Sequence, residues 1–116
     1  MTENMWGFKE DMGYRAGADL TGFDVEAIDG RIGKVDKHSE EVGAAYLVVD
    51  TGVWIFGRHV LLPAGTISSI DLGESTIYLS RTKDDIEHAP AFDKDKHLGD
   101  EEFHRQLTGY YGAPHS

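Results

Sequence analysis

The chain has 116 residues, of which 40% are hydrophobic and none is cysteine, so it predicts one domain with a modest core and excludes disulfides, thiolate metal sites and thiol nucleophiles. It contains no run of about 18 apolar residues, which excludes a membrane-spanning helix. The formal net charge of -10 at pH 7 is spread along the whole chain, and such a surface repels phosphate groups, so we expect neither nucleic acid nor an anionic membrane as a partner.

Residues 1–22 are expected to form an irregular N-terminal arm. Trp6, Phe8 and Tyr14 are more aromatic residues than a disordered tail usually carries. The arm therefore either docks on a surface or is a frayed terminus. It has neither a basic nor an apolar region of the kind found in signal peptides, so we expect a cytoplasmic protein.

The first predicted hairpin begins in residues 23–27, where apolar and acidic side chains alternate as in a half-buried strand. Asp29 and Gly30 follow, and this dipeptide is typical of a type I′ turn, whose two central residues both need a positive φ. The sequence therefore predicts a tight turn at this dipeptide.

The returning strand, residues 31–37, has an irregular apolar pattern. Ile32 and Val35 would face opposite sides of a regular strand. Gly33 lies between them and indicates a bulge, or a close approach of another backbone segment, that brings both to one side.

The later strands are short and separated by turn residues, with Pro63 at a corner. They are predicted over residues 44–50, 53–56, 58–62, 66–72 and 75–80. Residues 44–50 are so rich in apolar and β-branched side chains that we expect them to be buried on both faces. About six strands at this spacing predict an all-β sandwich or barrel, because closing the sheet removes exposed edges.

Residues 82–116 change to helical patterns. Thr82 is a predicted N-cap of one or two helical turns that stop before Pro90. A second short helix is predicted over residues 100–107, and Gly109 would be its C-cap.

Taken together, the chain resembles the PRC-barrel domain family, named after the cytoplasmic barrel of the photosynthetic reaction centre H subunit. The resemblance covers residues 23–81, and the residues that carry it are Asp29, Gly30, Gly33, Val35, 46–49, 60–63 and Ile70. Residues 82–116 resemble the extension of stand-alone bacterial members.

This resemblance implies a small six-stranded PRC-type β-barrel with a short helical C-terminal extension, without catalytic residues or a cofactor. Known members support other machinery, such as a membrane-bound electron-transfer complex or, with a companion domain, ribosome maturation. The chain has neither the membrane helix nor the companion domain, so neither role is carried over.

Six histidines and 21 carboxylates suggest a metal site. Residues 93–97 begin like a calcium loop, but Leu98 occupies the position that requires glycine. Asp100 and His104 are four residues apart on one face of the predicted helix, and His97 would have to fold back to complete a metal site. The alternative is a solvated acidic helix, and we expect no bound metal.

The sequence gives no sign of a catalytic site. Ser68, Ser69 and His59 lie in predicted strands, but no nucleophile-elbow motif surrounds either serine. Gly30 and Gly33 are too closely spaced for a phosphate-binding loop and precede a strand.

The aromatic residues are more informative about function. Trp54 and Phe56 would share one face of their strand, and the neighbouring strand is apolar on both faces. A small barrel has only one inside, so this outer face must be covered by the chain itself, by a second copy, or by both through exchange of arms. The candidate interface residues are Trp54, Phe56, Phe92, Phe103, Leu107 and Tyr110.

We therefore expect a non-enzymatic interaction or scaffold domain that associates with itself as a homodimer, with room for another protein partner. The alternative is a small-ligand or divalent-metal-binding module that uses the acidic, histidine-containing tail.

Overall fold

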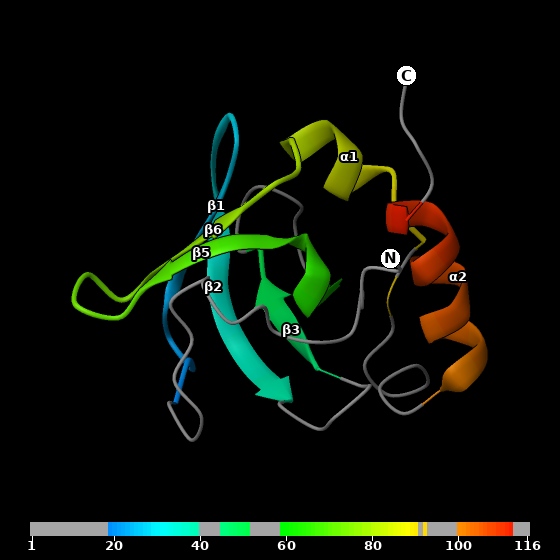
Figure 1. The fold of residues 1–116 in the computed structure, drawn as a ribbon, viewed down its shortest axis with the longest axis horizontal. Coiled ribbons are helices and arrows are strands. Elements are labelled where there is room, and N and C mark those ends of the chain that lie inside the picture. Colours follow the sequence, from blue (N-terminus) through cyan, green and yellow to red (C-terminus); the bar gives the residue numbers. More distant parts are fainter. Residues whose placement is uncertain (1–18, 40–44, 52–58, 91, 93–99, 113–116) are drawn as a thin grey trace, which may run out of the picture.

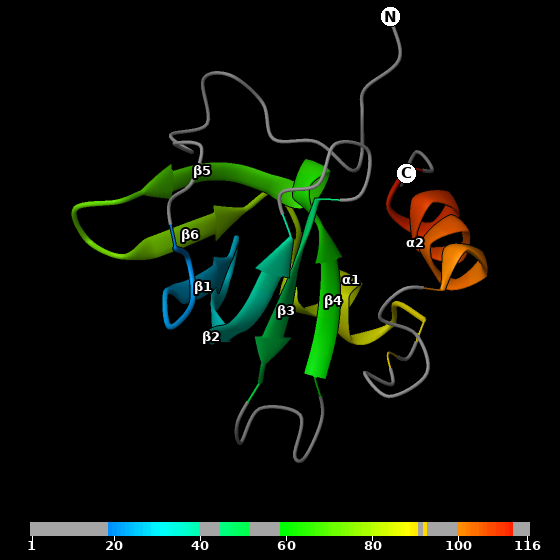
Figure 2. The same cartoon turned by 90° about the horizontal axis from the view of Figure 1, so that it is seen from below.

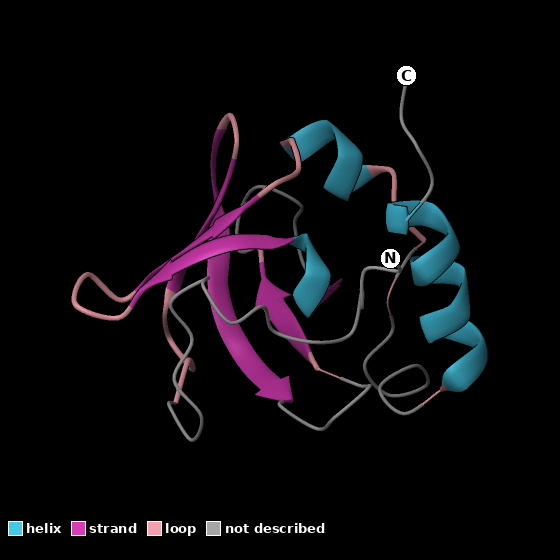
Figure 3. Ribbon diagram, viewed as in Figure 1, coloured by secondary structure: helices cyan, strands magenta, loops and turns pink. Residues whose placement is uncertain are grey.

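The computed structural model describes residues 19–39, 45–51, 59–90, 92 and 100–112, and the predicted strand at 53–56 lies outside these residues. Within these described residues, six strands, one short 3-10 helix and two α-helices follow one another (Figure 1, Figure 3). They are β1 (Asp24–Ala27), β2 (Gly30–Ser39), β3 (Tyr46–Asp50), β4 (His59–Pro63), η1 (Ala64–Thr66), β5 (Ile67–Asp71), β6 (Thr76–Leu79), α1 (Lys83–Glu87) and α2 (Glu101–Gly112).

The six strands form one mixed sheet in the order β4-β3-β2-β1-β6-β5. All neighbours are antiparallel except β1 and β6, which run parallel. The predicted strand-rich fold with short C-terminal helices is confirmed. In the part of the chain that the structure describes, β4 and β5 are the two edges of the sheet, so the closed barrel stays a prediction.

The first hairpin forms, but its turn differs from the predicted one. Ala27 pairs with Gly30, so Ile28 and Asp29 are the central residues. Ser75 is the only described residue other than glycine with a positive φ. Neither Ile28 nor Asp29 therefore has the positive φ that a type I′ turn requires, and the prediction of that turn type was wrong. The reason is tertiary: the Asp29 carboxylate accepts a hydrogen bond from the Lys83 amide (2.9 Å), which fixes the turn one residue earlier.

Gly33 produces both effects that the sequence predicts for it. Val25 pairs with Gly33 and Glu26 with Arg31, which leaves Ile32 as an extra residue in a bulge. A Cβ atom at Gly33 would lie only 2.0 Å from the carbonyl oxygen of Asp50 on β3. The bulge and this close approach let β2 bend, and both Ile32 and Val35 are buried.

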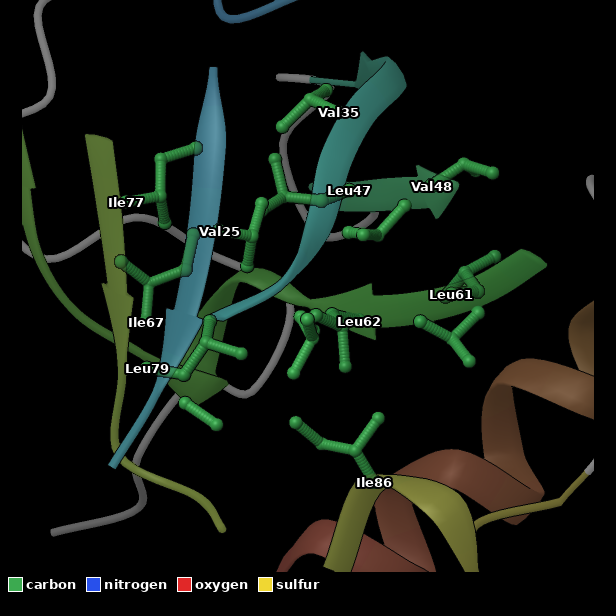
Figure 4. Packing of buried hydrophobic residues seen from close by; sticks show 14 of the residues in the cluster. Val25, Val35, Leu47, Val48, Leu61, Leu62, Ile67, Ile77, Leu79 and Ile86 are labelled. Atoms are coloured by element: carbon green, nitrogen blue, oxygen red, sulfur yellow. The ribbon is translucent and has the colours of Figure 1, made fainter. Parts of the chain in front are cut away.

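The concave side of the sheet holds the main core. Figure 4 shows side chains from both halves of the sheet pointing toward one another, among them Val25, Leu47, Leu62, Ile67, Ile77 and Leu79. All of them are buried. The core therefore joins strands from the two ends of the sheet.

The chain enters this core at Leu20, although Leu20 belongs to the predicted arm. Its side chain is fully buried, and its amide donates a hydrogen bond to Nε2 of His38 on β2 (3.2 Å). The Gly22 amide then donates to the Val35 carbonyl (2.8 Å). The last residues before β1 are thus bound to the sheet.

Pro63 is the last residue of β4 and marks the predicted corner. The Thr66 hydroxyl donates a hydrogen bond to the Pro63 carbonyl (2.8 Å), and the Ala64 amide donates to the Ala45 carbonyl (3.0 Å). These bonds hold η1, which connects one edge strand of the sheet to the other.

The second helix is longer than predicted. It runs through Gly109 to Gly112, so Gly109 is an interior residue and its assignment as a C-cap was wrong. A glycine inside a helix costs about 1 kcal/mol relative to alanine. Contacts of Tyr110 and Tyr111, which follow Gly109, outweigh this cost, as the next subsection shows.

We predict opposite effects for two glycine-to-alanine substitutions. Gly33→Ala should lower the free energy of unfolding by about 3 kcal/mol, because its methyl group would overlap the Asp50 carbonyl. Gly109→Ala should raise it by about 0.5–1 kcal/mol, since a Cβ there meets no atom within 4 Å and alanine favours the helix. Urea denaturation measures both, and a Gly33→Ala protein as stable as the parent would contradict the close approach.

Candidate interaction surface

Strands β3 and β4 are buried on both faces, as the sequence predicts for β3. Leu47 pairs with Leu62, and Val48 pairs with Leu61. Because side chains alternate along a strand, Val48 and Leu61 face away from the core that Leu47 and Leu62 enter. All four are buried, so the outer face of these strands is covered.

Helix α2 covers this outer face. Figure 2 shows α2 beside β4, on the side of the sheet away from the β5–β6 hairpin. The ring of His104 on α2 lies 5.8 Å from that of Tyr46, which has the same parity on β3 as Val48. Phe103, Leu107 and Tyr111 lie four residues apart on one side of α2 and are buried.

One further side chain belongs to this cover. Phe92 is buried and its ring lies 5.7 Å from that of Phe103 on α2. Ile86 of α1 is also fully buried, but Figure 4 shows it pointing from α1 toward Leu62, which belongs to the concave core. Helix α1 therefore contributes to the main core, and α2 with Phe92 covers the outer face.

The free energy of α2 comes mainly from this burial. Burying three large apolar side chains contributes about 5–9 kcal/mol before the cost of ordering them. An isolated helix of this length, 12 residues, is marginal in water. We conclude that α2 depends on the sheet for its stability.

Polar contacts hold the C-terminal end of α2. The Arg81 guanidinium, between β6 and α1, donates a hydrogen bond to the Tyr111 carbonyl and lies 5.7 Å from the centre of the Tyr111 ring. A cation at this end of a helix also interacts favourably with the helix dipole. Arg81 thus links the end of the sheet to the end of the helix.

Tyr110 makes the second polar link. Its hydroxyl donates a 2.6 Å hydrogen bond to the Asp85 carbonyl of α1. Burial, followed by the charges of Asp85 and Asp84, raises the pKa of Tyr110 above 10.0. The phenol is therefore a neutral donor throughout the neutral pH range.

Four of the six predicted interface residues belong to this cover. Phe92, Phe103 and Leu107 are buried within the chain, and Tyr110 is half-buried. In this arrangement the chain itself covers the outer face, which is the intramolecular alternative, so these side chains are not exposed to a partner. Trp54 and Phe56 lie outside the described residues.

The structure reveals two exposed apolar residues that the sequence reasoning missed. Ile28 is 67% exposed and Tyr78 is 39% exposed, and they are the only large hydrophobic side chains exposed among the described residues. The exposure of Tyr78 could have been predicted from the alternation of side chains in β6, because Ile77 and Leu79 are buried on either side of it. No local pattern predicts the exposure of Ile28, since it follows from the shifted turn.

The predicted metal pair serves other contacts. The Asp100 carboxylate accepts a hydrogen bond from the Glu102 amide (3.0 Å) at the start of α2, and His104 faces Tyr46. Among the described residues, no group of three or more His, Asp or Glu side chains is placed to hold a metal ion. His97 and the loop at 93–97 lie outside those residues, so the ligand-binding alternative stays a prediction.

The serines considered for catalysis lie at the edge of the sheet. Ser68 donates a hydrogen bond to the Tyr78 carbonyl (3.1 Å) from β5. His59 begins β4, at the opposite end of the strand order, and its Nε2 lies 3.6 Å from the Asp36 carboxylate. The lack of catalytic activity stays a prediction.

Neither described α-helix has the length and apolar character needed to cross a membrane. The cytoplasmic location stays a prediction.

Comparison with known proteins gives limited information. No protein-family model matches the chain, and no curated protein is similar to it. Among solved structures, the chain is similar to a protein from Pseudomonas aeruginosa described as the 16S ribosomal RNA processing protein RimM, with 26% identity and a TM-score of 0.47. The similarity covers 56% of this chain and 42% of that one. Membership of the PRC-barrel family stays a prediction.

This neighbour conflicts with one expectation. We excluded nucleic acid as a partner because negative charge is spread along the chain, whereas the name of the neighbour connects that protein with 16S ribosomal RNA. Net charge describes the average surface and not local contacts: Arg31, Lys34 and Lys37 are all exposed on β2. The exclusion of nucleic acid was therefore wrong.

We predict that Tyr110→Phe removes a pH-dependent part of the stability. The raised pKa means that the folded state favours the neutral phenol, so the stability from this group is present below about pH 10 and is lost as the pH rises through the folded-state value. The substitution should cost about 0.5–1.5 kcal/mol at pH 7 and make the loss of stability above pH 10 less steep.

Urea denaturation at pH 7 and pH 11 measures this effect, with Tyr78→Phe as the control at an exposed tyrosine. An equal decline in the parent and the Tyr110→Phe protein would contradict the role of the hydroxyl.

Proposed function

We propose that the chain is a non-enzymatic protein-interaction or scaffold domain that associates with itself. The observation that carries the proposal is the exposure of Ile28, in the turn after β1, and of Tyr78 on β6. Two surfaces of the sheet differ in this respect: α2 covers the outer face of β3 and β4, while these two side chains remain in contact with solvent.

The strand register supports a single surface around Tyr78. Tyr78 pairs with Glu26 on β1 and with Ser69 on β5. Ile28 is two residues beyond Glu26, and its amide donates a hydrogen bond to the Arg81 carbonyl, which places it at the end of β6 (2.9 Å). Tyr78 therefore shares one face of the sheet with Glu26 and Ser69, and Ile28 lies in the turn just beyond β1.

The chemistry of this surface suits a protein partner. An aromatic and an aliphatic side chain form its apolar part, and Glu26 and Ser69 are polar neighbours. Tyrosine is enriched in protein interfaces because it combines a large apolar area with a hydroxyl group. An apolar surface with a polar rim is the usual anatomy of such interfaces.

The charge of the chain sets the conditions for association. Two copies with a net charge of -10 each repel one another. Salt screens this repulsion over a distance of about 8–10 Å at moderate ionic strength. Association should therefore strengthen as salt is added, because the attractive part of the contact is apolar.

We predict association of the purified protein at concentrations on the order of tens of micromolar, measured by sedimentation velocity. Ile28→Ser combined with Tyr78→Ser should shift the protein to monomer without loss of fold, because both side chains are exposed. Gln106→Ala, at an exposed position of α2, is the matched control and should behave like the parent. A parent protein that is monomeric at these concentrations in both low and high salt would contradict self-association.

A further inference from the structure

The chain enters the sheet through a tight turn at residues 20–23. The Phe23 amide donates a hydrogen bond to the Leu20 carbonyl (3.1 Å), and Gly22 has a φ of 86°, as the third residue of a type II turn requires. The Gly22 amide donates to the Val35 carbonyl of β2 (2.8 Å). Backbone groups that do not titrate therefore close this turn and bind it to β2.

The Leu20 amide makes a bond of a different kind, because its acceptor is a titratable side chain. It donates to Nε2 of His38 (3.2 Å). His38 pairs with Leu47, whose side chain enters the core, so the imidazole lies on the core side of β2. The His38 side chain is only 15% exposed, and Leu20 is fully buried. This bond therefore joins the entering segment to the core side of the sheet.

The bond from Leu20 also selects the tautomer of the ring. A ring nitrogen that accepts a hydrogen bond from an amide carries no proton, so neutral His38 has its proton on Nδ1. Nδ1 is buried and has no hydrogen-bond partner among the described residues, so it does not itself favour this tautomer. A second proton on the ring must go to Nε2, where it would face the proton of the Leu20 amide.

Asp19 offers an acceptor for a protonated Nε2. Its Oδ1 lies 3.6 Å from Nε2 of His38, and it is the only acidic group among the described residues within ion-pair distance of the ring. The hydrogen bond from the Thr21 backbone is the main cause that lowers the pKa of Asp19 below 3.8. The carboxylate is therefore negative throughout the range in which histidine titrates.

The other charged residues near His38 face elsewhere. Lys37 pairs with Val48, so its exposed side chain lies on the outer face of β2. The Asp36 carboxylate lies 3.6 Å from Nε2 of His59 on β4. On β3, the residue opposite His38 is the apolar Leu47. Among the described residues, the Leu20 amide and the Asp19 carboxylate are thus the two groups that compete for Nε2.

We infer that His38 is a pH-sensitive switch for the attachment of residues 19–23 to the sheet. When the ring is neutral, Nε2 accepts the hydrogen bond of the Leu20 amide. When the ring is protonated, Nε2 becomes a donor, releases the Leu20 amide and binds the Asp19 carboxylate. The bond from Gly22 to Val35 is kept in both states, so protonation changes how the chain enters the sheet without unfolding it.

The test is an NMR titration of the isotope-labelled protein from pH 8 down to about pH 5.5, which spans the ordinary titration range of histidine. At pH 8, the ring nitrogen shifts should place the proton of neutral His38 on Nδ1. As the pH falls, the Leu20 amide proton should move upfield with the same midpoint as the His38 ring, because its hydrogen bond is lost.

Hydrogen exchange gives a second readout in the same samples. Exchange of the Leu20 amide, corrected for the intrinsic effect of pH, should become about three- to tenfold faster when His38 is protonated. The Gly22 amide is the internal control. It should neither shift with the His38 ring nor exchange faster, because its acceptor is the Val35 carbonyl.

Three variants make the result specific. His38→Gln keeps a side-chain acceptor but cannot titrate, so its Leu20 amide should not respond to pH. Asp19→Asn removes the charge that favours the protonated ring and should move the response to lower pH. His88→Gln, at an exposed histidine after α1, is the matched control and should behave like the parent.

Three results would overturn the inference. The first is a proton on Nε2 of neutral His38 at pH 8, and the second is a Leu20 amide that does not follow the titration of the ring. The third is a Leu20 response that persists in His38→Gln, since another group would then be the sensor. If His38→Gln does not fold, the titration of the parent protein decides alone. The outcome is independent of self-association, because none of these variants alters Ile28 or Tyr78.

Discussion

The structure depends on the burial of β3 and β4 on both faces. Leu47 and Leu62 fill the concave core, while Val48 and Leu61 leave an apolar outer face that water cannot cover without cost. This second face requires a covering layer, and α2 provides it. The links from Arg81 and Tyr110 hold the C-terminal end of this helix in place.

Local patterns in the sequence predicted the features that depend on near neighbours. The alternation in β1, the irregular register at Gly33 and the apolar run of β3 each appear in the structure. The features that were missed depend on distant contacts. The Asp29 carboxylate binds the Lys83 amide, 54 residues away, and shifts the first turn. Contacts of Tyr110 and Tyr111 continue α2 through Gly109, where its local sequence indicates an end.

The choice of candidate interface residues also depended on contacts between distant parts of the chain. From sequence, Phe103 and Leu107 were recognisable as an apolar stripe, but the sequence could not show whether the chain or a partner covers it. The structure places the stripe on β3 and β4 of its own chain and leaves Ile28 and Tyr78 exposed elsewhere. The proposed self-association therefore uses the exposed residues, and not the stripe that α2 buries against its own sheet.

The central claim is that α2 covers β3 and β4 of its own chain. The contact between Tyr46 and His104 tests it most directly, because these rings join β3 to α2 with their centres 5.8 Å apart. Isotope-filtered nuclear Overhauser spectra of a dilute mixture of labelled and unlabelled chains distinguish contacts within a chain from those between chains. The account predicts cross-peaks between these two rings within one chain. Their absence in the folded protein, or their presence only between chains, would contradict it.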